Sequence, residues 1–566
     1  MKAGTLRAIH GPNIYSHQPV LVMQLHLEAL TGQKSHDIAG FAERLLTQLP
    51  GLQAHHCTKD TAGDFVEHLR TGTDFGQVVE HVARELTELV GIPALHSQTN
   101  STAQAGIVNI VLAYRAEKAT EHLLRAAVAF VESLIQGETY PLDDLIRTTK
   151  RLIGHTELGP STRAIVTAAE QRGIPWQRLD EANLVQLGYG KHRRLIAAAM
   201  SSQTSALAVE IASDKELTKQ LLDRAGIPVP QGAIVRTAEE AVSVMEWLHK
   251  PVAVKPYNGC QGKGVSLNLH TPEQVSEAFH IAVEYSPEVL VEELFIGRDF
   301  RVLVVNGKLI AASERIPAHV IGDGTHTITE LIEIENHNPL RGEGHCSALT
   351  KIEIDDVMTA HLQKSGLTLD DIPATGEKVF LRENANLSKG GTAVDVTDRV
   401  HPQVRQICER AARVIGLDIC GIDLVLPDIT EPIRKGGAGI IEINAAPGLR
   451  MHTSPSIGQA RDVGAAIIEM LYPADTSARI PIISITGTNG KTTITRLIAH
   501  LLADTQTRVG MTTTEGVYLN DELIVAGDTT GPRSTQVILS DPTVDVAVLE
   551  VARGGIVRGG LGYDWS

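Results

Sequence analysis

Three oxygen-bearing side chains lie in two short apolar stretches of the sequence. Asp423 lies within Ile419–Leu426, and Glu442 and Asn444 lie within Ile440–Asn444. Residues two apart on a strand share a face, so Glu442 and Asn444 point together, and a neighbouring strand would add Asp423. Hard oxygen ligands beside a space for phosphates suit Mg²⁺. A buried hydrogen-bond network could satisfy the same groups. We predict a site for Mg²⁺ and the phosphates of ATP.

Lysines that could neutralise phosphate charge come earlier in the chain. Lys255 ends a short apolar run, and the glycine-rich loop Asn258–Val265 follows it, with Gly262 and Gly264. A lysine at a strand end beside such a loop can neutralise phosphate while the loop closes and excludes water. Lys219 is a second candidate for the same role. A lysine before a glycine turn is often only a surface residue, so this pattern depends on the acidic residues for support.

Two acidic residues and a hairpin complete this region. Val289–Leu294 contains Glu292 and Glu293, which fit the hinge that binds adenine and ribose. Arg301–Ala312 is expected to form a hairpin, because Asn306-Gly307 is a strong signal for a tight turn. Together these features resemble the ATP-grasp ligases, which activate a carboxylate as an acyl phosphate for attack by an amine. Such chemistry requires positioning and charge neutralisation rather than a side-chain nucleophile.

A second phosphate-binding pattern lies near the end of the sequence. The β-branched run Pro481–Thr486 predicts a buried strand, and a glycine loop with Lys491 follows it. Such a loop at a helix start cradles phosphates with backbone N–H groups, with Lys491 on the terminal phosphates and Thr492 on Mg²⁺. The loop consists of Gly487, Thr488, Asn489, Gly490, Lys491, Thr492 and Thr493. The helix is expected to place Ile494, Leu497, Ile498, Leu501 and Leu502 on one face.

The loop is shorter than the common G-x-x-x-x-G-K-[ST] form, because Ile485 stands where the first glycine would be. This version resembles the Mur ligases and folylpolyglutamate synthetases, which also form acyl phosphates. Glu550, after the strand Val546–Leu549, is expected to face the loop as a metal ligand, although a solvated charge at a strand end is the simpler alternative.

The elements around these motifs predict three domains. Residues 1–160 mix short strands and helices, residues 161–475 alternate strands and helices, and residues 476–566 contain the phosphate loop. The fold class is therefore multidomain α/β and α+β: an N-terminal α+β domain, an ATP-grasp domain and a partial P-loop α/β domain of Mur ligase type. Tyr472–Ile480 is a plausible linker. We expect the chain to end within the last domain.

The whole chain resembles the cyanophycin synthetases, which have these domains in this order. The resemblance implies that Arg315, His319 and Ser388 lie in or near the polymer site of the ATP-grasp domain, although surface or capping roles are the simpler alternatives, and it implies catalytic roles for Lys255, Arg315 and Lys491. The shared strings are His10–Asn13, Leu158–Thr162, Gln186–Gly190, Ser313–Val320, Asn386–Ser388 with Gly390-Gly391, and Glu442–Gly448.

The resemblance also implies the reaction. The ATP-grasp domain would add aspartate to the C-terminus of the polymer, and the Mur-like domain would add arginine to the β-carboxylate of that aspartate, both with ATP and Mg²⁺. The partners would be aspartate, arginine and the cyanophycin polymer or primer, in a homo-oligomer, either a dimer or a tetramer. Two alternatives stay open: polymerisation of β-aspartyl-arginine dipeptides by the ATP-grasp domain alone, and a non-catalytic ATP-binding scaffold for polymer granules.

Composition excludes other classes of protein. A net charge of −16 and an aromatic content of 4% are unfavourable for binding nucleic acid. No stretch approaches the roughly 20 apolar residues that a membrane span needs, so we expect no membrane partner. An odd number of cysteines without close pairs predicts a reducing compartment, and hence the cytoplasm. The five are Cys57, Cys260, Cys346, Cys408 and Cys420.

A helix in the N-terminal domain has a possible metal-binding face. Gln77, Glu80, His81 and Glu85 share that face by spacing. Some cyanophycin synthetases resemble inverted zinc peptidases here, with H-x-x-E-H followed by a glutamate, but Gln77 replaces the first histidine. Because an amide is a poor zinc ligand, we predict a solvated helix face, no zinc, no cleavage of polymer and a docking role for the domain.

Overall fold

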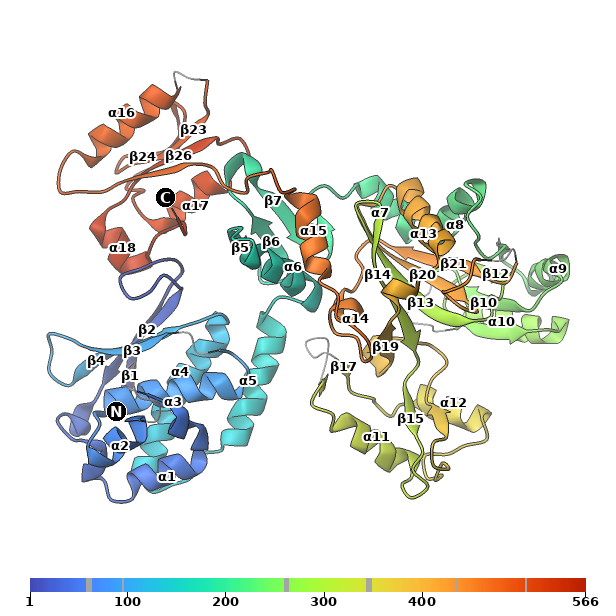
Figure 1. The fold of residues 1–566 in the computed structure, drawn as a ribbon, viewed down its shortest axis with the longest axis horizontal. Coiled ribbons are helices and arrows are strands. Elements are labelled where there is room, and N and C mark those ends of the chain that lie inside the picture. The colour runs from blue at the N-terminus through green and yellow to red at the C-terminus, as the bar shows by residue number, and fades with distance from the viewer. Residues whose placement is uncertain are drawn as a thin grey trace. The chain divides into compact units, whose positions relative to one another are not determined.

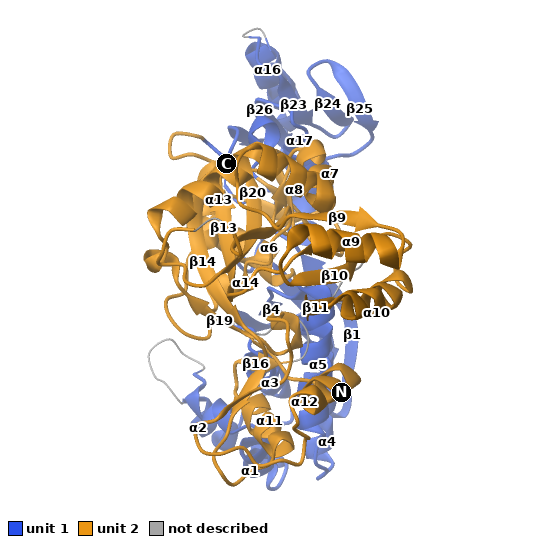
Figure 2. Cartoon of the chain, turned by 90° about the vertical axis from the view of Figure 1, so that its right-hand side faces the viewer, with its two compact units in different colours: residues 1–157, 188–193, 477–566 blue, residues 158–187, 194–476 orange. Residues whose placement is uncertain are grey.

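The computed structural model describes residues 1–56, 64–93, 96–258, 264–342, 349–433, 436–503 and 506–565. The chain forms two compact units (Figures 1 and 2). Unit 1 consists of residues 1–157, 188–193 and 477–566, and unit 2 of residues 158–187 and 194–476. Among the described helices, none is both long and apolar enough to cross a membrane.

The first part of unit 1 is an antiparallel sheet packed against helices. The strand order is β1-β2-β4-β3, and alternate residues of β2, such as Leu21 and Met23, enter the same core as helices α3 and α4. Helix α3 buries Glu80, His81 and Glu85 while Gln77 stays exposed, so the predicted solvated face is wrong for those three residues. The main elements are β1 (Lys2–Ile9), β2 (Val20–His26), β3 (Ser97–Ser101), β4 (Ile107–Ala113), α1 (Phe41–Gln48), α2 (Asp64–Thr71), α3 (Phe75–Leu89), α4 (Glu117–Ile135) and α5 (Leu142–Thr156).

The last part of unit 1 is a five-stranded sheet in the order β22-β26-β23-β24-β25. β26 pairs in parallel with both β22 and β23 and is buried. β22, the strand before the phosphate loop, is parallel as predicted but lies at the edge of the sheet, where only Ile485 is fully buried, so the prediction of a buried strand is wrong for the rest of it. The sheet begins with the predicted strand, shortened to Ile482–Ile485. Its elements are β22 (Ile482–Ile485), α16 (Lys491–Ala503), β23 (Val509–Thr512), β24 (Gly516–Leu519), β25 (Glu522–Ala526), α17 (Pro532–Leu539), β26 (Val546–Glu550) and α18 (Arg553–Gly559).

Helix α16 packs on a face that shares only Ile498 and Leu502 with the one predicted. Thr495 and Ala499 are buried, with Ile498 packed beside them. Leu497 and Leu501 are 55% and 62% exposed, and Ile494 is exposed as well. The spacing of the leucines and isoleucines was compatible with two overlapping faces, and small side chains allow the helix to approach the sheet on the other one.

A short segment from the middle of the chain completes this sheet's core. Tyr189 is buried with Ile480 and Val544, and the backbone N–H of Lys191 donates to the carbonyl of Val544 at 2.9 Å. Gly190 has φ +57°, and a β-carbon there would lie 2.6 Å from the Val544 oxygen. Residues 188–193 therefore belong structurally with residues 477–566, although the predicted boundaries assign them to the middle domain.

Unit 2 contains three main antiparallel sheets. Their strand orders are β5-β6-β7-β8, β11-β10-β12-β9 and β19-β14-β13-β20-β21. Their strands are β5 (Trp176–Arg178), β6 (Leu184–Leu187), β7 (Arg194–Ala197), β8 (Met200–Ser201), β9 (Gly232–Val235), β10 (Val252–Pro256), β11 (Ser266–Leu269), β12 (Val289–Glu293), β13 (Arg298–Val305), β14 (Lys308–Ile316), β19 (Thr392–Asp395), β20 (Ile419–Leu426) and β21 (Gly439–Asn444).

Helices cover these sheets and bury their apolar sides. α9 and α10 share a core with β10 and β12, and α13 packs on the five-stranded sheet. The expected hairpin is confirmed: Asn306 and Gly307 both have positive φ between β13 and β14, as a tight two-residue turn requires. The helices of unit 2 include α6 (Pro160–Gln171), α7 (Ala206–Ser213), α8 (Lys215–Arg224), α9 (Ala238–Leu248), α10 (Pro272–Val283), α11 (Ile328–Asn336), α12 (Asp356–Lys364), α13 (Pro402–Ile415), α14 (Arg450–Thr453) and α15 (Val463–Leu471).

The predicted linker is anchored rather than loose at its start. Tyr472 is fully buried, and its hydroxyl donates to the carbonyl of Leu187 at 2.8 Å. The division between the two units falls after Thr476, inside the predicted stretch Tyr472–Ile480.

Candidate nucleotide and ligation sites

A row of polar residues crosses the five-stranded sheet of unit 2. Asp395 on β19 is registered opposite Ser313 on β14, and Ser313 lies opposite Arg301 on β13. Arg301 lies opposite Asp423 on β20, which lies opposite Glu442 on β21. Because directly opposed residues of antiparallel strands project to the same side, all five side chains emerge on one face of the sheet. The prediction that Asp423 and Glu442 lie on neighbouring strands is confirmed.

Asp423 is the member of the row that pairs with two arginines. Arg301 binds it through Nε and through Nη2, the latter 3.0 Å from Oδ2, and Nη1 of Arg315 lies 3.4 Å from the same oxygen. Burial alone would raise the pKa of Asp423, but the two guanidinium groups hold it below its ordinary value. Sequence analysis missed Arg301; its position directly before the apolar run Val302–Val305 was the signal that could have revealed it.

Glu442 and Asn444 are less enclosed. Oε1 of Glu442 lies 3.8 Å from Nζ of Lys215, and the Asn444 amide makes a long contact of 3.5 Å with the carbonyl of Gly421. Both side chains keep partial access to solvent. The expected grouping of Glu442 with Asn444 on one strand is therefore observed.

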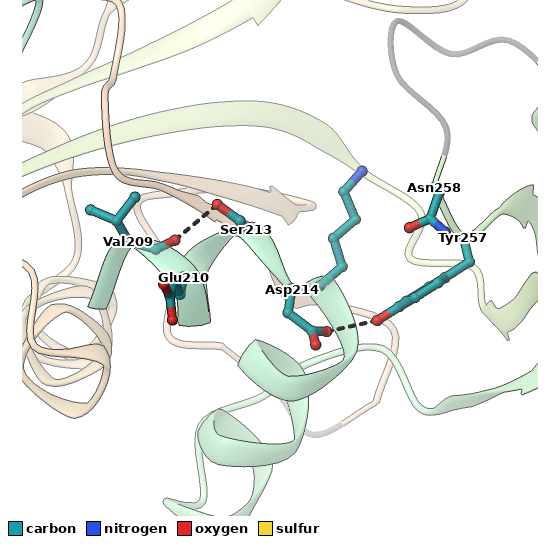
Figure 3. A pocket seen from close by; sticks show the side chains of 7 residues that line it. Val209, Glu210, Ser213, Asp214, Tyr257 and Asn258 are labelled. Carbon is teal, nitrogen blue, oxygen red and sulfur yellow. Dashed lines mark hydrogen bonds between the residues drawn. The ribbon is translucent and has the colours of Figure 1, made fainter. Parts of the chain in front are cut away.

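A pocket of about 640 Å³ is lined by Lys215, the residue that contacts Glu442 at this end of the row. Tyr257 and Asn258, which are labelled in Figure 3, line it as well. The Tyr257 hydroxyl donates to Asp214 at 2.8 Å, and burial beside that carboxylate raises the pKa of Tyr257 to about 12. Asp214 also caps the start of α8 through the N–H groups of Glu216 and Leu217. The side chain of Tyr257 is thus fixed in the pocket by its hydrogen bond to Asp214, which is itself bonded to the start of α8.

The two predicted phosphate-binding lysines converge on one glutamate. Glu292 on β12 pairs with both Lys219 of α8 and Lys255 of β10. Burial would raise the pKa of Glu292, but the adjacent lysines hold it below its ordinary value. Glu293, expected with Glu292 at the base and sugar, pairs instead with Lys250 and accepts from the N–H of Gly437 at 3.2 Å.

The glycine loop after β10 is described only in part. Gly262 lies outside the described residues, as does Gln261. Gly264 has φ +70°, and a β-carbon there would lie 2.6 Å from the ring of Tyr285. A glycine is therefore needed at this position both for the backbone and for the space.

The three predicted substrate residues separate in space. Arg315 joins the row by pairing with Asp423, and its Nη2 donates to Asp299 at 2.7 Å. His319 on β15 (His319–Ile321) bonds the carbonyl of Pro317, and burial lowers its pKa. The N–H of Ser388 donates to the side chain of Asn386. Among the described residues, neither His319 nor Ser388 forms a hydrogen bond with a member of the row.

The phosphate loop of unit 1 forms as predicted. Residues 486–490 are exposed between β22 and α16, with φ +77° at Gly490. Thr492 Oγ1 donates to Oε2 of Glu550 at 2.8 Å, and the N–H of Thr514 donates to the same oxygen at 3.2 Å. Glu550 is buried at the end of β26. The structure thus brings together Thr492 and Glu550, the two predicted metal ligands of this site.

The N-terminal sheet domain holds a third polar cluster. His55 lies between His81, 3.1 Å away, and Glu85, 3.0 Å away, and burial with the neighbouring His55 lowers the pKa of His81 to about 3. His55, Glu85 and Glu88 could offer ligand atoms within 4.8 Å of one another. This group excludes Gln77, and the prediction that the domain binds no zinc stays a prediction.

Three protein-family models match the chain in the predicted order. They are the cyanophycin synthase-like N-terminal domain at residues 21–136, the RimK-like ATP-grasp domain at residues 212–320 and 376–471, and the Mur ligase middle domain at residues 485–563. The chain is therefore a multidomain α/β protein with an ATP-grasp fold and a Mur ligase middle domain, which confirms the predicted fold class.

Curated relatives extend this similarity over all residues. Cyanophycin synthetase of Crocosphaera subtropica is 47% identical over 572 residues, covering 100% of this chain and 65% of the relative. The protein of the same name from Trichormus variabilis is 45% identical over 570 residues, covering 100% of this chain and 63% of the relative. The glutathione biosynthesis bifunctional protein GshAB of Mannheimia succiniciproducens is 34% identical over 321 residues, covering 55% of this chain and 42% of that protein.

The resemblance to cyanophycin synthetases is thus confirmed over the full length of the chain. The chain spans 63–65% of the length of the two cyanophycin synthetases.

Proposed function

Because the chain is similar to cyanophycin synthetases along its whole length, we propose that it is an ATP-dependent, amide-forming ligase that synthesises cyanophycin, multi-L-arginyl-poly-L-aspartate. Residues 161–475 would add aspartate and residues 476–566 would contribute to adding arginine, with residues 1–160 docking polymer. The observation that carries the proposal is the presence of two separate charged sites, the row of Asp423 in unit 2 and the phosphate loop of Lys491 in unit 1. One site per amide bond is what alternating addition of two amino acids requires.

In the first reaction, the terminal carboxylate of the polymer attacks the γ-phosphorus of ATP, and ADP leaves. The amine of aspartate then attacks the acyl carbon of the resulting acyl phosphate, the amine proton is lost and phosphate departs. Lys219 and Lys255 would hold the phosphates of ATP, exchanging contacts now made with Glu292. Arg301 and Arg315 would neutralise the charge that develops on the transferred phosphoryl group and the tetrahedral oxygen, because fixed cations in a dry site need no reorganisation during reaction.

Mg²⁺ fits one end of the row better than its centre. Glu442 and Asn444 are partly open and present hard oxygen atoms from one strand. Asp423 is buried and already neutralised by Arg301 and Arg315. If it also bound Mg²⁺, its carboxylate would have to be divided between the metal and the two guanidinium groups. When bound, Mg²⁺ would lower the charge of the ATP phosphates. In unit 1, Thr492 and Glu550 are the corresponding residues, and the Thr492 hydroxyl that now bonds Glu550 would turn its oxygen to the metal.

In the second reaction, the β-carboxylate of the new aspartate is activated in the same way and the amine of arginine attacks it. The backbone of Gly487–Thr493 would bind the phosphates, and Lys491 at the start of α16 would neutralise them. Glu293, Gly262 and Gly264 would complete the nucleotide site of the first domain, and His319 and Ser388 would contact polymer with Arg315. We further propose a cytoplasmic homo-oligomer, a dimer or tetramer, without nucleic-acid or membrane partners.

The test is incubation of the full-length protein with ATP, Mg²⁺, aspartate, arginine and a short primer, omitting each amino acid in turn. Omitting arginine should stop growth after one aspartate per chain, and omitting aspartate should stop all growth. Polymer growth from β-aspartyl-arginine dipeptides but not from the free amino acids would replace this proposal with dipeptide polymerisation. ATP binding without any amide formation would leave a scaffold role instead.

A further inference from the structure

A buried histidine covers the row at Ser313. His452 on α14 is 2% exposed, and its Nδ1 lies 2.9 Å from the Ser313 hydroxyl. Ser313 is the direct cross-strand neighbour of Arg301 on β13 and of Asp395 on β19. Burial, together with the positive charge of Arg301, lowers the pKa of His452 to about 3. The imidazole therefore adds no second cation beside Arg301 at neutral pH.

Arg461 fastens α14 to the same part of the sheet. Its backbone N–H donates to the carbonyl of His452 at 2.8 Å. Its guanidinium binds Asp395, with Nη2 to Oδ2 at 2.6 Å, and Asp398, with Nη2 to Oδ2 at 2.7 Å. One residue thus holds the histidine's backbone and neutralises the carboxylate at the far end of the row.

On its other side, the Arg301 side chain lies against the backbone of Gly421, next to Pro447. A β-carbon at Gly421 would lie 3.1 Å from Cδ and 3.2 Å from Nη1 of Arg301, and 2.7 Å from Cβ of Pro447. The arginine side chain therefore extends across Gly421 toward Asp423. It lies between a glycine that leaves room for it and Ser313 of the neighbouring strand β14, which is bonded to His452 of α14.

We propose that His452, through Ser313, is a positioning residue that keeps Arg301 directed to Asp423 and away from Asp395. The inference rests on the proposed function, in which Arg301 meets the transferred phosphoryl group. Asp395 is two strands from Arg301 on the same face, a separation of roughly 10 Å between backbones, which the two side chains together can bridge. His452 holds the hydroxyl of Ser313, which lies between Arg301 and Asp395 in the row, and Arg461 satisfies Asp395, so neither position offers Arg301 an alternative.

The test compares His452→Leu with His452→Asn in the full-length protein. Leucine fills space but loses the bond to Ser313, whereas the asparagine amide can replace Nδ1. For His452→Leu we expect kcat for aspartate addition to a primer to fall roughly tenfold, with KM for ATP within about twofold of wild type, because Lys219 and Lys255 are untouched. His452→Asn should recover most of kcat. Thr453→Ala, on the same turn, should match wild type.

Wild-type kcat in His452→Leu would overturn the inference. Equal losses in both His452 variants, accompanied by a lower melting temperature, would also overturn it, because they would indicate a purely structural role. Absence of aspartate addition by the wild-type protein would refute the proposed function instead. In that case a crystal structure of His452→Leu still decides the inference: Arg301 turned toward Asp395 supports it, and Arg301 unchanged on Asp423 refutes it.

Discussion

The candidate site of the ATP-grasp domain holds its charges buried and already paired, whereas the phosphate loop of the Mur-like domain exposes its binding groups. Lys219 and Lys255 share Glu292, and Arg301 and Arg315 share Asp423. By contrast, residues 486–490 are all exposed and Lys491 stands at the start of α16. A buried cation must have a partner, because losing water costs several kcal/mol per ion, while a loop in water needs none.

This difference predicts two kinds of sensitivity. At the buried lysines and arginines of the ATP-grasp site, a ligand replaces an existing ion pair, so removing one of those charges or its partner should harm both stability and catalysis. In the phosphate loop, a ligand replaces water, so removing a charge should harm catalysis alone.

The largest effect is expected at the open end of the row. Glu442→Ala should reduce aspartate incorporation into a primer by roughly 10²–10³-fold, because a carboxylate that would hold Mg²⁺ is lost. The fold should persist, since Glu442 is only partly buried and its contact with Lys215 is long, at 3.8 Å. Labelled aspartate measures the loss, with the exposed Glu246→Ala as control. Near-normal incorporation of aspartate in Glu442→Ala would show that Glu442 is not part of the Mg²⁺ site.

Lys491→Ala should reduce arginine addition on the order of 10²-fold, because the loop loses its cation. A single aspartate addition to an arginine-bearing primer should remain measurable. Arg496→Ala, farther along α16 and paired with Glu515, is the matched control and should keep both reactions. If Lys491→Ala also abolished aspartate addition, the model of two independent sites would be wrong.

Glu292→Gln should lower the free energy of unfolding by about 4 kcal/mol at neutral pH, because two buried lysines lose their carboxylate. Lys491→Ala should leave it unchanged, and denaturant titration compares the two. The folded pKa of Glu292 is held below its ordinary 4.5, so its contribution is complete above that pH and is lost as pH falls toward the lowered value. The difference in the free energy of unfolding between wild type and Glu292→Gln should therefore become smaller in acid. A difference that does not change with pH would argue against the ion pair.

Gly190→Ala should destabilise the phosphate-loop sheet by about 2–3 kcal/mol, since it combines a left-handed backbone with overpacking. Gly226→Ala is the control: Gly226 has φ +69° but nothing within 4 Å of an added β-carbon, so only about 1 kcal/mol is expected. Hydrogen exchange should show loosening of residues 477–565 in Gly190→Ala, with arginine addition reduced and aspartate addition retained. Equal effects in the two variants would indicate that residues 188–193 do not support the sheet.

The last prediction is that the N-terminal domain has no zinc-dependent activity. The N-terminal domain, which contributes to neither nucleotide site, should bind no zinc and should make no primer, because Gln77 replaces a histidine ligand. Metal analysis combined with a primer-free assay measures this. Stoichiometric zinc together with unprimed synthesis would contradict it and would direct attention to His55, Glu85 and Glu88. Gln77→His creating either property would support the present explanation.

The sequence by itself determined the local elements and the chemistry they carry. Glu442 and Asn444 share a face because strand periodicity is two residues, and Asn306-Gly307 turns the chain because both residues tolerate positive φ. The strand, glycine loop and helix at Pro481–Leu502 were predictable for the same reason. Each of these patterns extends over a few neighbouring residues, so no distant contact was needed to recognise it.

Only the tertiary structure decided which side chains meet. Arg301 reaches Asp423, and Ser313 reaches His452, through the register of strands and a helix far apart in the chain. Residues 188–193 complete a sheet formed almost 300 residues later, and Thr495 rather than Leu497 of α16 is buried. Periodicity shows that a face exists, but the packing partner selects the face, and the registry of non-neighbouring strands depends on the packing of the whole core.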